Sequence, residues 1–295
     1  MPSPRILITG ASGLLGGHLC LAAEQECEVY GAYHSNKTLV AGTKAIPIDL
    51  GSESDLAMKL AELRPQMIIH AAVLQVDACE REPQLAERVN VAASRSLAQW
   101  CEHLRARLVY ISSDLVFEGA KGNYAETDSA QPLMLYGKNK LAAEQTVLAA
   151  CPRACVVRLP LLYGFPAAGG SNFFLNTLAR LQRGERVPVF FDQYRTPGWV
   201  NNMAAAVWEL ARSDFHGLVH VAGATRCSRF EMAQIMCRLA GFEETLLQPL
   251  SRLEVSMPAP RPQDVSLDCS KAKSFLQTKL LELEEGLHNA LEQKH

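Results

Sequence analysis

Tyr136 and Lys140 form a pair of side chains whose types and spacing suggest proton transfer. Residues 135–149 have helical spacing, and side chains four residues apart lie on one face of a helix. A tyrosine hydroxyl has a free pKa of about 10, so it needs help from its surroundings to act as an acid or a base. A neighbouring ammonium group favours the phenolate and lowers that pKa. The pair therefore predicts an acid–base centre, and a packing tyrosine beside a solvated lysine is the alternative.

A second set of polar side chains, Ser112, Ser113 and Asp114, ends the apolar run that begins at Leu108. Such a run is typical of a buried parallel strand. The active crevice of a parallel sheet lies outside the carboxyl ends of its strands. A hydroxyl at this strand end could therefore hydrogen-bond the oxygen of a substrate carbonyl beside Tyr136.

A glycine turn, Gly-Ala-Ser-Gly-Leu-Leu-Gly over residues 10–16, follows an apolar run at 5–9 and precedes helical spacing at 13–23. Glycine allows a tight turn, close approach of backbone N–H groups to a pyrophosphate, and close packing of helix on strand. The context predicts a nicotinamide dinucleotide site, with a routine turn as the alternative. A cationic nicotinamide would also favour the Tyr136 phenolate, and Lys140 could hold the ribose hydroxyls.

The end of the second predicted strand bears on the choice of dinucleotide. NAD-selective folds usually place Asp or Glu there, where the carboxylate binds the ribose 2′-hydroxyl. Residues 32–37 read Ala-Tyr-His-Ser-Asn-Lys instead. His34 and Lys37 could bind a 2′-phosphate, or they could be solvated loop residues. The segment favours NADP and leaves NAD possible. Asp49, after the third strand, would suit the adenine edge, or is a plain turn acid.

Alternating strands and helices must position these residues. We expect strands over 5–9, 28–33, 44–48, 66–70, 108–112 and 154–159, and helices over 13–23, 52–63, 83–103 and 135–149. This pattern predicts an α/β fold with a Rossmann-type, doubly wound parallel sheet. Helices are expected later over 173–182, 201–213 and 229–240. We assign residues 1–165 to an NAD(P)-binding domain and 166–295 to a smaller C-terminal substrate-binding lobe, with segments interleaved with the first domain.

Composition narrows the function classes. The 295 residues are 48% hydrophobic and 20% charged with a net charge of −2, so neither nucleic acid nor a membrane is an expected partner. Nine scattered cysteines without a Cys-x-x-Cys pair indicate reduced thiols, with neither a disulfide framework nor a metal site. The N-terminal residues lack the pattern of a signal peptide, which predicts a cytoplasmic protein. His70, at the end of a predicted strand, is expected to be a hydrogen-bonded core histidine.

Several segments together resemble the extended short-chain dehydrogenases, and within them the dTDP-4-dehydrorhamnose reductase family. The matching segments are TGASGLLG at 9–16, HAA at 70–72, VDACE at 76–80, VN at 89–90, ISSDLVFEG at 111–119, PLMLYGKNKLAAE at 132–144, RLPLLYG at 158–164, NF at 172–173 and DQ at 192–193. The chain is also similar to the regulatory β subunit of methionine adenosyltransferase, which shares the Ser-Ser-Asp-x-Val-Phe block and the RP…LDCSK pattern at 261–271.

The resemblance implies roles for particular residues. Ser113 would polarise a sugar carbonyl, Tyr136 would deliver the proton, and Lys140 would assist it, in reduction of a 4-keto-6-deoxy sugar for dTDP-rhamnose biosynthesis. The residues expected to contact the cofactor are Gly10, Ser12, Gly13, Leu14, Leu15, Gly16, His34, Lys37, Asp49, Leu50, Ala71, Ala72, Tyr136, Lys140 and Pro160. The residues expected to contact the nucleotide sugar are Ser113, Asp114, Tyr163, Asn172 and Arg261.

One departure from the family pattern concerns the substrate. The reductases usually follow Asp-Gln with a Gly-x-Pro turn, whereas this chain has Tyr194-Arg195-Thr196-Pro197. A guanidinium at Arg261 suits a diphosphate, and an ordinary surface arginine is the alternative. An NADP(H)-dependent nucleotide-sugar reductase is the first hypothesis. A non-catalytic NADP-binding regulatory subunit and a nucleotide-sugar epimerase are the others, and a homodimer is possible in each case.

Overall fold

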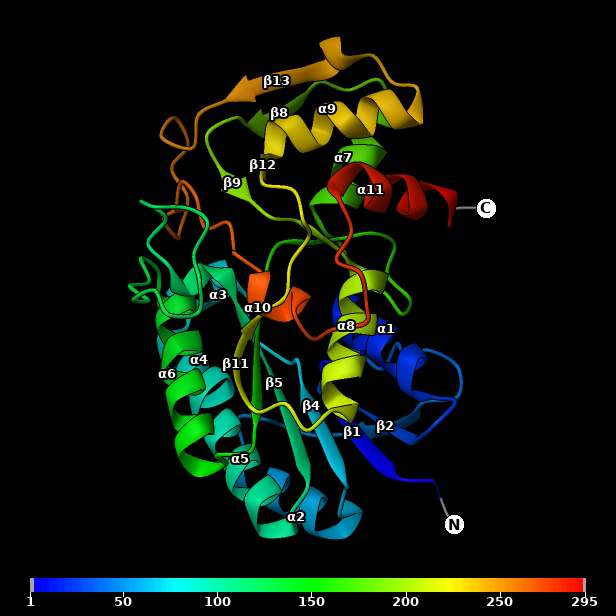
Figure 1. The fold of residues 1–295 in the computed structure, drawn as a ribbon, viewed down its shortest axis with the longest axis vertical. Helices are drawn as coiled ribbons and strands as arrows, with labels where there is room; N and C mark the ends of the chain where they lie inside the picture. Colours follow the sequence, from blue (N-terminus) through cyan, green and yellow to red (C-terminus); the bar gives the residue numbers. More distant parts are fainter. Residues whose placement is uncertain (1–2, 294–295) are drawn as a thin grey trace.

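The computed structural model describes residues 3–293, and its larger part is built on a seven-stranded parallel sheet (Figure 1). Every pair of neighbouring strands in this sheet is parallel. In sheet order the strands are β11 (Gly217–His220), β6 (Cys155–Leu159), β5 (Arg107–Ser113), β4 (Met67–His70), β1 (Arg5–Thr9), β2 (Glu28–Tyr33) and β3 (Lys44–Pro47). The order of strands reverses between β1 and β4, where a crevice forms at their carboxyl ends. The predicted fold class is confirmed.

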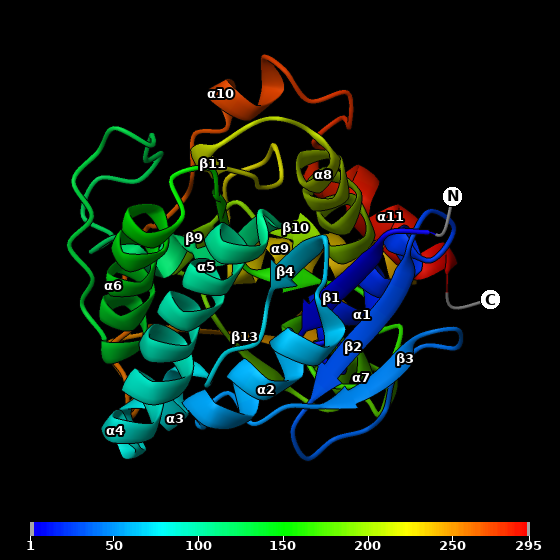
Figure 2. The ribbon, with the colours of Figure 1, turned by 90° about the horizontal axis from the view of Figure 1, so that it is seen from below.

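Helices cover both faces of the sheet (Figure 2). α1 (Leu14–Ala23) and α8 (Val200–Arg212) lie on one face, and α2 (Glu53–Leu63), α5 (Ala93–Leu104) and α6 (Leu135–Ala150) lie on the other. Side chains of a strand point alternately to the two faces. In β1, Ile6 and Ile8 pack in the core beneath α1 and α8, and Leu7 packs in the core beneath α2, α5 and α6. Burial on both faces explains why this strand is apolar at every position.

The helix predicted over 83–103 is confirmed, because residues 83–104 are helical without a break, but a π-helical turn lies within it. The structure has α3 (Val76–Arg81), α4 (Pro83–Ala86), a π-helical turn η1 (Glu87–Ala92), and then α5. Asn90, in the π turn, accepts a hydrogen bond from the Leu74 N–H at 2.7 Å and donates to the Leu74 carbonyl at 3.3 Å. A π turn often marks a functional segment, and this one binds the loop that follows β4.

A smaller lobe lies beyond the carboxyl ends of the sheet (Figure 1). Its helices are α7 (Phe173–Gln182), α9 (Arg229–Ala240) and α11 (Leu283–Glu292), and its strands β8 (Val187–Phe190) and β13 (Leu247–Leu250) pair in parallel. The remaining elements are short: β7 (Leu162–Tyr163), β9 (Tyr194–Arg195), β10 (Gly198–Trp199), β12 (Cys227–Ser228), the single turns η2 (Asp114–Val116) and η3 (Glu244–Leu246), and α10 (Ser270–Lys273). β9 pairs antiparallel with β12, and β10 pairs in parallel with β7.

The chain passes between the two parts more than once. After β6 it enters the lobe, returns to the sheet at α8 and β11, and enters the lobe again at β12. The segments of 166–295 are therefore shared between the lobe and the sheet layers. A domain boundary at residue 165 stays a prediction.

Candidate active site

The glycine turn at the end of β1 is built for close approach. Gly10 has a φ of +70°, and a Cβ there would lie 2.8 Å from the Ala72 nitrogen. A Cβ at Gly16 would lie 2.0 Å from the Gly10 oxygen. Gly13 caps α1 without a side-chain hydrogen bond, so no side chain satisfies the first N–H groups of that helix. These features fit a pyrophosphate at a helix N-terminus.

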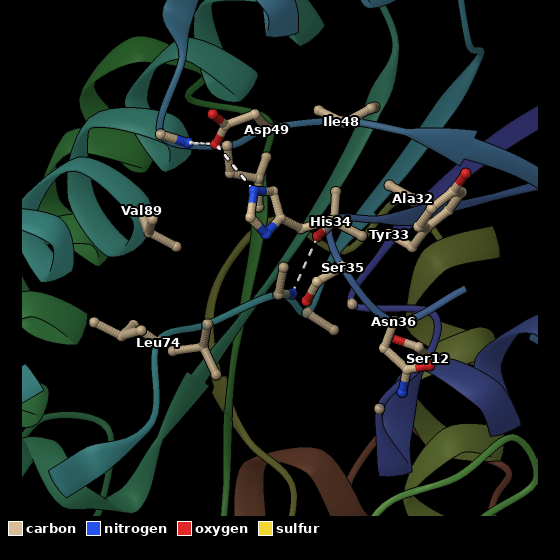
Figure 3. Close-up of a pocket in the computed structure, with 18 of the residues that line it drawn as sticks. Ser12, Ala32, Tyr33, His34, Ser35, Asn36, Ile48, Asp49, Leu74 and Val89 are labelled. Atoms are coloured by element: carbon tan, nitrogen blue, oxygen red, sulfur yellow. Dashed lines mark hydrogen bonds and ion pairs between the residues drawn. The ribbon is translucent and has the colours of Figure 1, made fainter. Parts of the chain in front are cut away.

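A cavity of about 510 Å³ lies between the glycine turn and the ends of β2 and β3 (Figure 3). Ser12, His34, Asp49, Leu50 and Ala72 line it, as the predicted cofactor contacts require. The His34 ring nitrogen Nε2 lies 4.0 Å from the Asp49 carboxylate, and both side chains are largely exposed.

Two basic residues near this cavity depart from the predictions. Lys37 is exposed and does not line the cavity. Arg88, which the sequence did not single out, lines it from the π turn. No acidic residue follows β2 directly, because Tyr33 is succeeded by His34, Ser35 and Asn36.

A second cavity of about 410 Å³ continues from the first and shares Gly10, Gly13, Ala71, Val73 and Gln75 with it. The predicted cofactor contacts Leu14, Leu15, Gly16 and Pro160 line this end, as do Ser113, Asp114, Tyr136 and Arg261. The two cavities form one cleft that runs from the end of β2 to the end of β5. Except for Lys37 and Lys140, the predicted dinucleotide contacts and the predicted reacting groups therefore lie along a single cleft.

Ser113 and Tyr136 meet at the second end of the cleft. Both side chains line this cavity, and the Ser113 hydroxyl is close enough to Tyr136 to lower the pKa of its phenol. The Ser113 hydroxyl also donates to Asp114 Oδ1 at 3.0 Å and accepts from the Leu115 N–H at 3.2 Å. Gly137 explains the closeness, because a Cβ there would lie 2.1 Å from the Leu115 oxygen. Only glycine lets α6 approach η2 this closely and bring Tyr136 to the end of β5.

The charge state of Tyr136 follows from its surroundings. Burial raises the pKa of its phenol well above the ordinary value, and the Asp114 carboxylate raises it further, while the nearby Ser113 hydroxyl and the charge of Arg195 oppose the shift. The phenol is consequently protonated at neutral pH, which suits a proton donor.

Lys140 lies one helical turn beyond Tyr136 on α6 and is 3% exposed. Its Nζ donates to the Ile111 carbonyl at 2.7 Å and lies 4.8 Å from the centre of the Tyr110 ring. Burial lowers the pKa of Lys140 to about 8, and the Glu144 carboxylate opposes that shift. The amine does not line either cavity, so the structure places it next to the site but engaged with the backbone of β5.

Three arginines line the second end of the cleft. Arg195 Nη1 donates to Asp114 Oδ2 at 2.6 Å, and both side chains are at most 5% exposed. Arg261 Nη2 donates to Asp77 Oδ1 at 2.8 Å. Arg229 Nε donates to the Gln193 side-chain oxygen. The sequence analysis named Arg261 as a residue that could bind the diphosphate of the substrate. The replacement of the family's Gly-x-Pro turn was the one available signal for Arg195, and no local pattern pointed to Arg229.

Two predicted substrate contacts lie outside the cleft lining. Tyr163 is 1% exposed and its hydroxyl is 3.5 Å from the Leu283 carbonyl, within the core of the lobe. Asn172 is the N-cap of α7, where its side chain accepts from the Leu175 N–H and donates to the Gly164 carbonyl. Its neighbour Ser171 lines the cleft instead. Both predicted contacts would require these side chains to leave their present partners.

Several residues have purely structural partners. His70 is buried between the Thr9 and Ser94 hydroxyls at 2.7 and 3.0 Å, and burial lowers its pKa to about 3, so it is the hydrogen-bonded core histidine that the sequence predicts.

The nine cysteines are all free thiols. Within residues 3–293, no cluster of three or more His, Cys, Asp or Glu side chains could hold a metal ion. No helix in the same range is long and apolar enough to cross a membrane.

Three proteins of known description are similar to this chain over most of its length. It is 34% identical over 266 residues to the dTDP-4-dehydrorhamnose reductase of Mycobacterium tuberculosis, covering 88% of this chain and 83% of that protein. It is 31% identical over 287 residues to the Haloferax volcanii protein named "Probable low-salt glycan biosynthesis reductase Agl14", covering 95% of each. It is 32% identical over 289 residues to methionine adenosyltransferase 2 subunit beta of Xenopus laevis, covering 93% and 83%.

Solved structures agree with these relatives. The dTDP-4-dehydrorhamnose reductase of Bacillus anthracis in complex with NADP superposes with a TM-score of 0.86 at 29% identity, covering 99% of each chain. MoeE5 in complex with UDP-glucose and NAD superposes with a TM-score of 0.83 at 25% identity, covering 98% of each. The family model described as RmlD substrate binding domain matches residues 4–295. Because that match spans nearly the whole chain, this protein belongs to the RmlD substrate binding domain family.

Proposed function

We propose that this protein is an NADP(H)-dependent reductase that acts on the ketone of a 4-keto-6-deoxy nucleotide sugar. The observation that carries the proposal is the meeting of the Ser113 and Tyr136 hydroxyls in a cleft whose other end is the glycine turn. Related proteins named as dTDP-4-dehydrorhamnose reductases, and the structure of one in complex with NADP, support the same reading.

The cleft residues fit a nicotinamide dinucleotide. The glycine turn would hold the pyrophosphate on the first N–H groups of α1. Arg88 supplies positive charge near the end of β2, the His34 ring can donate a hydrogen bond there, and no carboxylate directly follows that strand to repel a 2′-phosphate. These residues favour NADP, and NAD remains an alternative cofactor. Ala71 and Pro160 would flank the nicotinamide end.

The reaction assigns each polar side chain one task. NADPH, when bound along the cleft, would supply the hydride for the carbonyl carbon of the sugar. Ser113 would turn its proton from Asp114 toward the carbonyl oxygen and hold that oxygen next to Tyr136. Tyr136, protonated at neutral pH, would transfer its phenolic proton to the oxygen as negative charge develops there. Lys140, buried one turn away, would stabilise the resulting phenolate.

Turnover tests this function. The protein is mixed with NADPH and dTDP-4-keto-6-deoxyglucose, and the absorbance of the reduced cofactor is followed, with NADH in a parallel sample. We expect oxidation of NADPH and slower oxidation of NADH. If neither cofactor is consumed with this or related 4-keto sugars, the reductase assignment fails.

A second function deserves a separate test, because the methionine adenosyltransferase 2 subunit beta of Xenopus laevis is almost as similar to this chain. In that reading the protein would bind NADP and regulate a partner enzyme without turnover. Co-purification with a methionine adenosyltransferase catalytic subunit would support the reading, and failure to co-purify would remove it. A cytoplasmic location and a homodimer stay predictions under either function.

A further inference from the structure

Arg229 is the one of the three cleft arginines that has no carboxylate partner within the described residues 3–293. Arg195 pairs with Asp114 at 2.6 Å and Arg261 pairs with Asp77 at 2.8 Å. Arg229 has only the neutral side chain of Gln193 as a hydrogen-bond acceptor. The cleft therefore contains one guanidinium that forms no ion pair within residues 3–293, although the Asp114 carboxylate still attracts its charge.

The position of Arg229 is defined from three sides. It is the first residue of α9, directly after the capping residue Ser228, and β12 brings it beside β9 through the pairing of Cys227 with Arg195. Its guanidinium carbon lies 4.8 Å from the centre of the Phe173 ring. Gln193, on the other side, is 1% exposed and accepts from Arg229 Nε. The guanidinium is thus held by stacking and by one hydrogen bond.

Gln193 itself is oriented at a cost. Its side-chain oxygen accepts from Arg229, and its side-chain nitrogen is buried without an acceptor among the described residues. A buried amide donor that lacks an acceptor destabilises the folded protein. Gln193 therefore orients Arg229 through its side-chain oxygen, while the hydrogen-bonding capacity of its own side-chain nitrogen is left unused.

We propose that Arg229 binds the diphosphate of the nucleotide sugar, as an anion-selecting residue of the substrate end of the cleft. This inference rests on the proposed function, because it requires that a nucleotide sugar enters this end. A diphosphate diester carries two negative charges, and the terminal nitrogens of a guanidinium suit its paired oxygens. Burial and the repulsion of Arg195 and Arg261 lower the pKa of Arg229 to about 9, while the Asp114 carboxylate opposes that shift. A diphosphate would add further negative charge beside the guanidinium.

Binding of dTDP, measured by titration calorimetry without NADPH or turnover, tests the inference. Arg229→Met keeps a long apolar side chain beside Phe173 and removes the charge. We expect it to weaken dTDP binding by about 10- to 100-fold, the effect of losing a hydrogen bond to a charged group. Arg229→Lys keeps the charge but not the planar guanidinium. Its affinity for dTDP should lie between those of the parent protein and Arg229→Met. Thymidine, which lacks phosphates, should bind both forms equally.

Arg238→Met is the matched control, because it lies on the same helix and pairs with Glu284 at the exposed surface. It should leave dTDP binding unchanged. The thermal midpoint of the ligand-free protein separates binding from a structural role. Removal of a partly buried cation that forms no ion pair should leave that midpoint unchanged or raise it. A large fall in the midpoint together with weaker binding would mean that Arg229 is structural, and would overturn the inference.

Four further outcomes are distinguishable. Equal dTDP affinity for the parent protein and Arg229→Met would overturn the inference whatever the turnover assay gives. Failure of both dTDP and UDP to bind the parent protein would also overturn it. If Arg229→Met keeps dTDP affinity but loses affinity for UDP-glucuronic acid, the anion that it binds is a sugar carboxylate and the diphosphate assignment is wrong. If dTDP binds through Arg229 but no NADPH is oxidised, the reductase proposal alone fails.

Discussion

Arg195→Gln perturbs the ion pair that connects the lobe to the end of β5. Arg195 and Asp114 are 5% and 2% exposed and lie 2.6 Å apart, so the substitution leaves a carboxylate buried without its counter-charge. Breaking a buried pair in this way costs about 3–5 kcal/mol of unfolding free energy. At about 2 °C per kcal/mol for a protein of this size, the thermal midpoint should fall by about 6–10 °C. Circular dichroism during heating at pH 7 measures that midpoint.

The same substitution should alter catalysis separately from stability. Asp114 raises the pKa of Tyr136 and Arg195 lowers it. Without Arg195 the Tyr136 pKa rises further, so any alkaline limb of turnover that reports this phenol should move to higher pH. Asp114→Asn combined with Arg195→Gln removes both charges and should recover most of the lost stability.

Arg212→Gln provides the control for this prediction. Arg212 pairs with Glu26 at 2.9 Å, but both side chains are about half exposed, at 48% and 50%. Exposed pairs contribute about 0–1 kcal/mol, so the midpoint should change by at most about 2 °C. If Arg195→Gln were no more destabilising than Arg212→Gln, the reasoning about the buried pair would be refuted.

Three other predictions address the cleft. Tyr136→Phe should lower turnover by about 10²- to 10⁴-fold with cofactor affinity retained, whereas Tyr163→Phe, whose hydroxyl lies in the lobe core, should keep activity; unchanged turnover in Tyr136→Phe excludes it as the proton donor. His34→Asp should weaken NADPH binding relative to NADH by roughly 10-fold, because a carboxylate would face the 2′-phosphate; fluorescence titration gives both affinities, and an unchanged ratio counts against this position. Burial holds the pKa of Lys140 at about 8 instead of 10.5, so between these pH values the unfolded chain binds the proton that the folded protein has released. The wild-type protein should therefore gain stability relative to Lys140→Met as pH rises through that window, and denaturant titrations that show a constant difference would contradict the assignment.

Local patterns in the sequence were sufficient for the elements that carry their own signals. The strand–glycine–helix unit at 5–23 could be predicted because glycine spacing and apolar runs are properties of neighbouring residues. The helix at 229–240 could be predicted for the same reason, since Ser228 and Glu231 form a capping box at its start.

Features that depend on distant contacts could not be read from the sequence. The helical pattern of 83–103 gives no sign that Asn90 binds the Leu74 backbone, and that contact accompanies the π turn. Arg195 and Arg229 come together through the pairing of two strands of two residues each, β9 and β12, which are too short to show a period. β13 was missed because its four residues, Leu-Gln-Pro-Leu, include a proline that argues against a strand.

The late position of β11 has a consequence for how this protein is made. β6 ends at residue 159, and the strand that covers its outer edge begins only at residue 217. During synthesis, β6 therefore leaves the ribosome as an unpaired edge strand of an apolar sheet, well before β11 emerges to pair with it. Unpaired borders of this kind template intermolecular association. A fragment that stops at residue 165 would keep that border permanently, so it should aggregate rather than fold into a soluble nucleotide-binding half.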